Sequence, residues 1–398
     1  MPSRVVFVTH SAAGAGAELL MLRLLARPIG RPATVVLLEE GELVPMLRAA
    51  GVETIVLPVE AEVLAFRRTG GILSAARLVG PVLRASRALA RRVRPDDVVV
   101  CTSQKAFLLG CLARTGRRFA LVWWLHDILT PEHFSPSAIA LAVGLSRRLC
   151  RRVIANSPET EAAYVAAGGS RAATRVVEPG IDLAAFACAP RRRAAREAGG
   201  RPLLVHVSRI APWKNQMAIV EAMARVDGVD CRIVGACLFG EEDYARALRE
   251  RIATLGLEDR VTLEGQRPDV AEILAEADIF AHVPLAAEPF GQVVIEAMAS
   301  GLPVVVARTG APGRIASDSF AIRVNATDPD AIADAIATLA CDPGRRARMG
   351  EAARRAAAAY DLAVTRERFM AAIADLGRDG RTAAADGAPP AARRVPTD

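Results

Sequence analysis

Two acidic side chains eight residues apart are the first groups in this chain that could do chemistry. Glu288 stands just before an apolar segment with helical spacing and Glu296 stands inside it, within the stretch EPFGQVVIEAMASGLPVV. Ionised carboxylates can accept hydrogen bonds from the hydroxyls of a sugar or a ribose. Gly291, between them, allows the backbone to approach a ligand closely. The apolar neighbours of Glu296 favour a partly buried cleft over an ordinary helix surface.

Two cations form a second charged segment upstream. Arg209 and Lys214 lie in SRIAPWK, between a strand-like run and a helical one, where fixed charges and a helix N-terminus suit a diphosphate. Lys214 is one of only two lysines among 51 basic residues, and its compact ammonium suits a phosphate oxygen in a tight space. Alone, the segment is typical of a solvated strand–helix loop. Together with the two acids, it predicts a nucleotide-sugar site.

Two turns in the first half add weaker candidates. The strand-like run 120–124 leads into LHD, so His126 could bond a hydroxyl of a transferred sugar or of an acceptor; a helix-capping His–Asp turn is the alternative. Gly14 and Gly16 open a helix directly after the first strand-like run, without the third glycine of a dinucleotide-binding fingerprint. We expect that turn to cap a cleft with its amides.

Short apolar runs alternate with longer helical patterns along the chain, which predicts parallel sheets covered by helices on both faces. The expected strands are 4–9, 33–38, 53–57, 97–101, 120–124, 152–155, 174–177, 203–207, 231–235, 261–264, 278–283, 303–306 and 320–324. The expected helices include 17–26, 72–93, 137–151, 215–226, 242–255, 292–299, 328–340 and 345–359. The pattern occurs twice, so we expect two doubly wound, Rossmann-like α/β domains that face each other across a cleft.

Breaker-rich residues around 183–202 mark the join between the two units. The expected division is one Rossmann-like domain over 1–185, a second over 186–360, and a C-terminal helix over 361–376 that could cross back to the first domain. Residues 377–398 are rich in Gly, Ala, Pro and Arg without periodicity, which predicts a disordered tail.

Composition restricts the function classes. The chain has 398 residues, of which 52% are hydrophobic and 24% charged, as expected of a two-domain globular protein. A net charge of +7 raises a basic nucleic-acid-binding protein as an alternative, but 4% aromatic content counts against it. Seven scattered cysteines without a C-x-x-C pair argue against a disulfide framework or zinc site. Without a signal-peptide or membrane-spanning pattern, we expect a cytoplasmic protein.

The helical segment 72–93 carries arginines on one side and apolar residues that could form another. A basic amphipathic helix can rest on an anionic membrane, which would place the protein at the inner face of the membrane and suit a lipid-linked acceptor. A solvated helix face in an arginine-rich protein is an equally good interpretation.

Together these segments resemble the retaining glycosyltransferases of the GT-B fold, in the large family with the E-x7-E motif (glycosyl transferases group 1). That family includes sucrose synthases and bacterial mannosyl- and glucosyltransferases. The resemblance covers roughly residues 4–375 and rests on E-x7-E, S-R-x4-K, LHD and the G-x-G-A-E turn at 14–18. It implies that residues 1–185 form the acceptor domain and residues 186–360 the nucleotide-sugar donor domain.

The resemblance also implies a role for each matching position. Arg209 and Lys214 would bind the diphosphate of the sugar donor, and Glu296 would hold its ribose. The remaining assignments concern the sugar and the cleft: Glu288, with the backbone of Phe290 and Gly291, would hold the donor sugar, His126 would lie near the reaction centre, and Gly16 would lie near the diphosphate or the acceptor.

The implied reaction moves a hexosyl unit from a UDP- or GDP-sugar to a hydroxyl of a glycan or lipid-linked acceptor, with retention at the anomeric carbon. We expect a role in glycan, polysaccharide or glycolipid synthesis, with no metal, no other cofactor and no nucleic-acid partner. The rival enzymes are a GT-B sugar-nucleotide epimerase and a phosphorylase.

Three positions depart from the family pattern. Arg314 stands where the family often has the Glu of G-G-x-x-E, and Pro179 replaces the Asn of P-N-G-I-D. Asn215 follows Lys214 where glycine is usual. None of these changes removes a group expected to bind the sugar donor, but each alters a local loop.

Overall fold

The structure of this chain is a computed structural model. It describes residues 4–14, 16–57, 59, 72–132, 134–187, 200–237 and 240–376, with the backbone alone for 72–78. The predicted tail, 377–398, and residues 188–199 of the predicted join lie outside the described residues.

Two parallel sheets organise the molecule. The first has the order β3-β2-β1-β4-β5-β6-β7, and the second β10-β9-β8-β11-β12-β13. The strands of the first sheet are β1 Val5–Thr9, β2 Ala33–Leu37, β3 Glu53–Val56, β4 Val98–Cys101, β5 Ala120–Leu125, β6 Cys150–Ala155 and β7 Thr174–Val176. Those of the second are β8 Leu203–Val207, β9 Asp230–Val234, β10 Val261–Gly265, β11 Ile279–His282, β12 Val304–Ala307 and β13 Ala321–Val324. Every predicted strand is confirmed, and the doubly wound α/β class with it.

Helices cover both sheets. In the first half they are α1 Gly16–Leu25, α2 Leu43–Ala49, α4 Ile72–Arg92, α5 Gln104–Gly116, α6 Pro136–Leu149, α7 Pro158–Ala166 and the short η1 Leu183–Phe186. In the second they are η2 Pro212–Lys214, α9 Gln216–Met223, α10 Glu242–Thr254, α11 Val270–Glu276, α12 Gln292–Ala299, α13 Gly310–Ile315, α14 Pro329–Ala340, α15 Pro343–Ala357, η3 Ala358–Tyr360 and α16 Leu362–Ile373. The eight helices predicted between strands are all present, and the predicted C-terminal helix is present as α16.

Sequence chemistry explains these elements locally. The strands β4 (VVVC) and β12 (VVVA) are buried along their whole length, because β-branched side chains suit a sheet covered on both faces. Several helices begin at a polar residue whose side chain caps them. The Ser103 hydroxyl accepts from the Ala106 amide at 3.3 Å at the start of α5, and Asp328 caps α14 just before Pro329.

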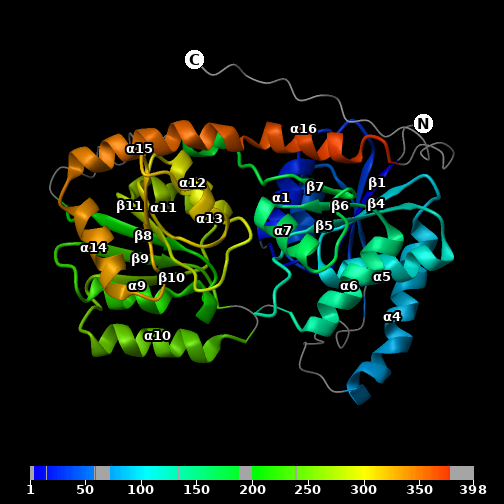
Figure 1. The fold of residues 1–398 in the computed structure, drawn as a ribbon, viewed down its shortest axis with the longest axis horizontal. Coiled ribbons are helices and arrows are strands. Elements are labelled where there is room, and N and C mark those ends of the chain that lie inside the picture. Colours follow the sequence, from blue (N-terminus) through cyan, green and yellow to red (C-terminus); the bar gives the residue numbers. More distant parts are fainter. Residues whose placement is uncertain are drawn as a thin grey trace.

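The two lobes lie side by side, and α15 and α16 run along one edge from the C-terminal lobe to the N-terminal lobe (Figure 1). The ring of Phe369 in α16 lies 5.7 Å from that of Phe7 in β1, centroid to centroid, and both side chains are fully buried. The last helix is therefore part of the hydrophobic core of the first sheet.

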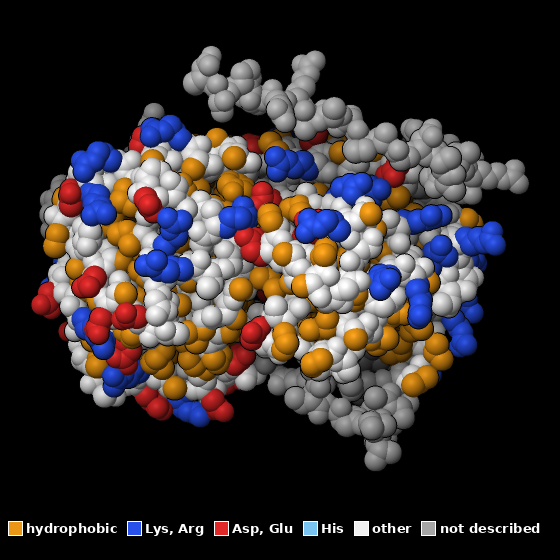
Figure 2. Space-filling view, in the orientation of Figure 1, with side chains coloured by type: hydrophobic (Ala, Val, Ile, Leu, Met, Phe, Trp, Pro, Cys, Tyr) orange, Lys and Arg blue, Asp and Glu red, His pale blue; other side chains and the backbone are white. Residues whose placement is uncertain are grey.

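The basic helix α4 turns its apolar side inward. Leu89 is 1% exposed and Val82 packs against the same core, whereas Arg84, Arg87 and Arg91 are exposed. Figure 2 shows Lys and Arg side chains along the right-hand edge of the molecule, the side on which Figure 1 draws α4. The apolar side of α4 around Val82 and Leu89 is thus occupied by protein, while Val79, at 56% exposure, and the arginines face outward. In the chain as described, no helix is both long and apolar enough to cross a bilayer.

Candidate functional site at the carboxyl edge of the second sheet

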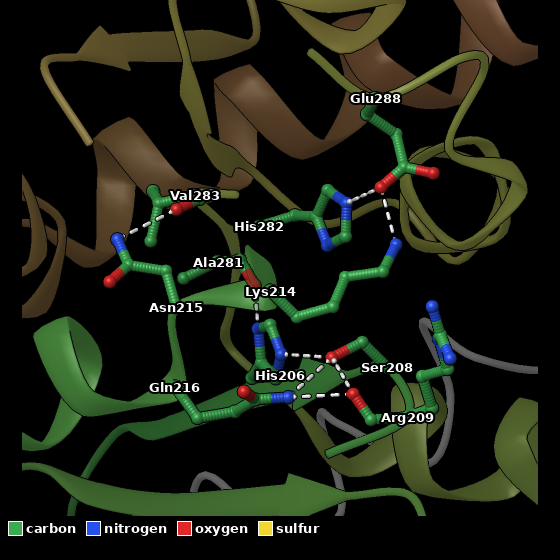
Figure 3. A network of polar contacts seen from close by, with 10 residues as sticks. All are labelled: His206, Ser208, Arg209, Lys214, Asn215, Gln216, Ala281, His282, Val283 and Glu288. Carbon is green, nitrogen blue, oxygen red and sulfur yellow. Dashed lines mark hydrogen bonds and ion pairs between the residues drawn. The ribbon is translucent and has the colours of Figure 1, made fainter. Parts of the chain in front are cut away.

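The two predicted cations and the first predicted acid, Glu288, meet where the strand order of the second sheet reverses, between β8 and β11. Open α/β sheets bind ligands at this kind of position. The chain leaving β8 carries Arg209 and Lys214, and the chain leaving β11 carries Glu288. Figure 3 shows Lys214 and Glu288 pointing toward each other, with Arg209 on the same side. Segments that are distant in sequence therefore form one charged cluster.

Asn215 explains why the Lys214 loop tolerates the loss of the usual glycine. Its backbone is left-handed, with φ of 63°, a conformation that asparagine adopts more readily than most residues. Its side-chain Nδ2 donates to the carbonyl oxygens of Val283 (3.0 Å) and Ala326 (2.7 Å). The substitution keeps the turn and ties the Lys214 loop to two other segments.

A buried polar network lies beneath Arg209. Nδ1 of His206 lies 2.9 Å from the Ala281 carbonyl oxygen, so this nitrogen carries the proton and donates. Nε2 therefore accepts from the Ser208 hydroxyl at 2.6 Å. Gln216 Nε2 donates to Ser208 Oγ and to the Arg209 carbonyl, both at 2.8 Å. Burial, helped by the neighbouring His282, lowers the pKa of His206 to about 3, so the ring is neutral and the backbone of Arg209 is firmly held.

Glu288 is the centre of the charged cluster. Its Oε2 accepts from the Lys214 ammonium and from Nε2 of His282, the latter at 3.2 Å. Burial opposes ionisation, but the Lys214 charge and the His282 hydrogen bond outweigh it and hold the pKa of Glu288 below its usual range. Glu288 is thus an ionised carboxylate, although only 8% of it is exposed.

The two oxygens of Glu288 have different surroundings. Both contacts, from Lys214 and from His282, go to Oε2, and Figure 3 shows Oε1 directed away from that pair. An ionised carboxylate has lone pairs on both oxygens, so Oε1 can accept a hydrogen bond from a ligand hydroxyl.

Trp213 contacts both cations of the loop. The Lys214 ammonium lies 4.1 Å from the centre of its ring, and the Arg209 guanidinium carbon lies 5.6 Å from it. Cations are attracted to the face of an indole ring, so Trp213 helps to keep both charges on one side of the loop.

The start of α12 places the second acid. Gly291 precedes α12 with a left-handed φ of 78°, and a Cβ there would lie 2.9 Å from a Pro312 side-chain carbon. Phe290 is 2% exposed and its ring contacts Tyr360 edge-on, so its side chain belongs to the core and only its backbone is available to a ligand. Glu296, within α12, is 8% exposed, as predicted for a partly buried carboxylate.

Glu296 and α12 also touch the first domain. Oε1 of Glu296 lies 3.2 Å from the Arg23 guanidinium of α1, and Gln292 Nε2 donates to the carbonyl of Gly16 at 3.1 Å. Gly16 therefore lies beside the N-terminal end of α12. These contacts join the lobes next to the predicted ribose carboxylate, and no sequence pattern pointed to Arg23.

His126 follows β5 in the first domain, as predicted. Its ring lies 4.8 Å from that of Trp124, and its Nε2 has no hydrogen-bond partner among the described residues. Burial lowers the pKa of His126 to about 3, so the ring is neutral. The helix-capping alternative is wrong, because the next helix, α6, begins at Pro136 and is capped by Ser135.

Sequence reasoning missed the two histidines of the network. His206 and His282 stand inside strands and are fully buried. The signal was present, since an imidazole in an otherwise apolar strand needs a hydrogen-bond partner. The strand pattern alone did not indicate which residues would be the hydrogen-bond partners of these two histidines.

Arg314, which replaces the family's usual glutamate, has a definite role. It leaves the end of α13 and pairs with two carboxylates of the first domain, Glu159 at 2.7 Å and Glu178 at 2.6 Å. This substitution therefore adds a second polar connection between the lobes, independent of that between Arg23 and Glu296.

No group of three or more His, Cys, Asp or Glu side chains is arranged to hold a metal ion in the stretches of chain for which the structure gives positions. The expectation that the reaction needs no metal is not tested by this geometry and stays a prediction.

Two family models match the chain. The one described as glycosyl transferases group 1 matches residues 190–356, and the one described as glycosyltransferase family 4 matches residues 41–185. The fold and these matches define a two-domain glycosyltransferase of the GT-B type, as the sequence predicted.

Individual relatives of this chain are also glycosyltransferases. The D-inositol 3-phosphate glycosyltransferase of Kribbella flavida is 30% identical over 66% of this chain and 68% of its own length. A GDP-mannose-dependent α-(1-6)-phosphatidylinositol monomannoside mannosyltransferase of Mycolicibacterium smegmatis is 35% identical over 49% of this chain and 54% of its own length. The crystal structure of Anabaena HepE with UDP-glucose superposes with a TM-score of 0.82 and 29% identity, over 94% of this chain and all of that one. The chain belongs to the group 1 glycosyltransferases.

Proposed function

We propose that this enzyme transfers a hexosyl unit from a nucleoside-diphosphate sugar to a hydroxyl of a glycan or lipid-linked acceptor, with retention at the anomeric carbon and without a metal. The observation that carries the proposal is the cluster of Arg209, Lys214 and Glu288 at the strand-order reversal of the second sheet. The similar HepE protein, crystallised in complex with UDP-glucose, supports the class of sugar donor.

The chemistry follows from the charges. As the glycosidic bond breaks, negative charge builds on the leaving diphosphate, and Arg209, Lys214 and the amides at the start of α12 would stabilise it. Oε1 of Glu288 would accept a hydrogen bond from a hydroxyl of the donor sugar, and Glu296 would accept hydrogen bonds from the ribose hydroxyls. His126, as a neutral imidazole with a ring nitrogen to offer, would bond the sugar or the acceptor from the opposite lobe. We assign neither acid as a covalent nucleophile.

A thermal-shift panel tests the sugar donor. UDP-glucose, GDP-mannose and ADP-glucose are added separately, and a ligand that binds only the folded state raises the unfolding midpoint. We expect at least one midpoint to rise, and the rise to disappear in the Glu296→Gln variant. A panel without any rise would contradict the proposal.

Product analysis tests retention and the metal. With the donor identified, the anomeric configuration of the product is read by NMR, and the reaction is repeated with EDTA. We expect the configuration of the donor to be kept and the rate to survive chelation. Inverted product would exclude the retaining assignment, and EDTA-sensitive turnover would exclude the metal-free one.

The same assay separates the rival enzymes. An epimerase would convert the sugar nucleotide without an acceptor, and a phosphorylase would use inorganic phosphate as co-substrate. We expect neither reaction. Binding to DNA or RNA at physiological salt, measured by gel shift, would instead support the nucleic-acid alternative.

The acceptor and the location of the enzyme are linked questions. Two of the relatives are named for inositol phosphate and for phosphatidylinositol monomannoside, which supports a polar or lipid-linked hydroxyl here. A cytoplasmic enzyme using the latter would meet the membrane through the exposed arginines of α4. Flotation with anionic vesicles at low salt tests this contact, and no flotation would remove it.

A further inference from the structure

His282 is the buried group of the site that the proposed mechanism does not use. It is the last residue of β11 and its side chain is wholly buried. Its ring lies nearly parallel to those of His206, at 5.8 Å between centroids, and Phe280, at 6.5 Å. The imidazole is therefore held in a fixed plane by the sheet, and it cannot reach a substrate.

The proton position on His282 follows from its partner. Glu288 is ionised and can only accept, so Nε2 of His282, 3.2 Å from Oε2, must carry hydrogen and donate. Nδ1 has no partner among the residues that the structure describes. Burial lowers the pKa of His282, and Lys214 adds to this while Glu288 opposes it. The neighbouring His206 is neutral as well. The His282 ring therefore donates to Glu288 as an uncharged imidazole.

We propose that His282 is a positioning residue that fixes the Glu288 carboxylate, so that Oε2 is held and Oε1 is presented to the sugar of the nucleotide donor. This inference rests on the proposed function. Glu288 has two hydrogen-bond donors on one oxygen, and these differ in stiffness. Lys214 ends a flexible four-carbon stem, whereas His282 is rigid.

The difference in stiffness explains why Glu288 needs His282 in addition to Lys214. When a diphosphate is bound, the Lys214 ammonium can turn part of its hydrogen bonding toward the phosphate oxygens. The carboxylate would then be free to rotate if Lys214 were its sole anchor. His282 keeps Glu288 in place through that exchange, and because the ring is neutral it anchors the carboxylate without adding a second positive charge to that of Lys214.

Two substitutions separate positioning from folding. His282→Gln can place a side-chain N–H near the position of Nε2, whereas His282→Leu fills similar space without any hydrogen-bond donor. The readout is the ratio of affinities for the nucleotide sugar and for the nucleoside diphosphate alone, measured calorimetrically with UDP-glucose and UDP, or with the donor that the panel identifies.

We expect His282→Leu to lose about ten- to hundredfold in affinity for the nucleotide sugar, the usual effect of deleting a hydrogen bond to a charged group, and to bind the nucleoside diphosphate as the wild type does. His282→Gln should restore most of the loss. The acid limb of the kcat/KM profile should also move to higher pH in His282→Leu, because Glu288 loses a group that stabilises its charge.

Three results would contradict the positioning role of His282, and they can be told apart. If wild type and His282→Leu bind the nucleotide sugar equally well, the positioning role is wrong while the proposed function stands. If His282→Leu loses nucleotide and nucleotide sugar alike, His282 merely maintains the local fold, which also overturns the inference. If the wild type binds no nucleotide sugar, the proposed function fails first and the inference with it.

Discussion

The role of Lys214 depends on the shape of its side chain as well as on its charge. The chain uses arginine for nearly every cation, yet here an ammonium contacts the Glu288 carboxylate and the Trp213 ring at once. A planar guanidinium has a different shape and would need both partners to move.

We predict that Lys214→Ala lowers kcat by on the order of 10²–10³, because a preorganised positive group is lost from the leaving diphosphate. Lys214→Arg should restore only a small part of the rate. The measurement is steady-state turnover with the donor identified by thermal shift.

Arg225→Ala is the matched control for that prediction. Arg225 is a partly exposed cation near the end of α9 that pairs with Glu221 and Asp330, away from the site. Its loss should leave turnover within about twofold of the wild type, as usual for exposed ion pairs. Near-normal turnover of Lys214→Ala would show that Lys214 does not serve the leaving group.

Burial also makes His206 a determinant of acid stability. Its pKa is about 3 when folded against an ordinary 6.5, so between these values the unfolded chain binds the extra proton. The contribution of His206 to the free energy of unfolding is therefore fully present above about pH 6.5 and is lost as the pH falls below that value. The described histidines all have lowered pKa values and act in the same direction: His10, His126, His206 and His282.

We predict that His206→Asn, which can keep a hydrogen bond to the Ala281 carbonyl, makes this acid dependence shallower by about one proton, or about 1.4 kcal/mol per pH unit. Urea unfolding between about pH 6 and pH 5 measures it, a window in which most carboxyl groups are ionised both folded and unfolded. An unchanged slope would mean that His206 is protonated in the folded protein.

At the scale of elements, the loop after β8 depends on the strand beside it. Gly235, after β9, has a φ of 144°, and a Cβ there would lie 1.8 Å from the Ser208 carbonyl oxygen. That carbonyl adjoins Arg209, so any side chain at 235 must displace the cationic loop. Gly235 was not recognised from sequence, because close approach to a neighbouring strand leaves no local pattern.

We predict that Gly235→Ala weakens nucleotide binding by at least tenfold while the protein still folds, because the loop can move more easily than the sheet. Gly256→Ala is the control. It also has a positive φ, 64°, which lies in the left-handed region that other residues enter at modest cost, and nothing lies within 4 Å of its added Cβ. It should cost about 1 kcal/mol of stability and leave nucleotide affinity intact. Equal affinities in the two variants would contradict a steric role for Gly235.

The elements themselves were largely readable from the sequence. Continuous valine-rich runs such as β4 and β12 identify buried strands, since little else places so many β-branched side chains in succession. Short helices were harder. The helices α11 and α13 have seven and six residues, so their hydrophobic periodicity spans fewer than two turns.

Across the whole molecule, ion pairs join the two lobes at Arg23–Glu296 and at Arg314 with Glu159 and Glu178. We predict that Arg314→Glu opens the lobes relative to each other, because three carboxylates would replace two salt bridges. Partly exposed pairs of this kind contribute about 0.5–1 kcal/mol each, enough for a several-fold shift between open and closed forms. Small-angle scattering and interlobe fluorescence transfer would measure it.

The effect of Arg314 can be isolated by two further variants. Adding Glu178→Arg to Arg314→Glu restores one opposite-charge pair and should restore the compact form. Arg323→Glu is the control, since Arg323 has the same side-chain exposure of 37% but pairs with Asp318 inside the second lobe. An equal opening in Arg323→Glu would attribute the change to net charge alone.

The sheets, the family and the two charged segments could be predicted from the residues alone, because strand burial and the E-x7-E and S-R-x4-K patterns are local properties of the chain. The groups that those charges contact depend on how the elements pack together. His282 and Lys214 share one oxygen of Glu288, Arg23 reaches Glu296, and Arg314 ties the lobes together. Each of these contacts joins residues on separate elements, and parallel strands with crossover helices bring such residues together at one sheet edge without any mark in the local sequence.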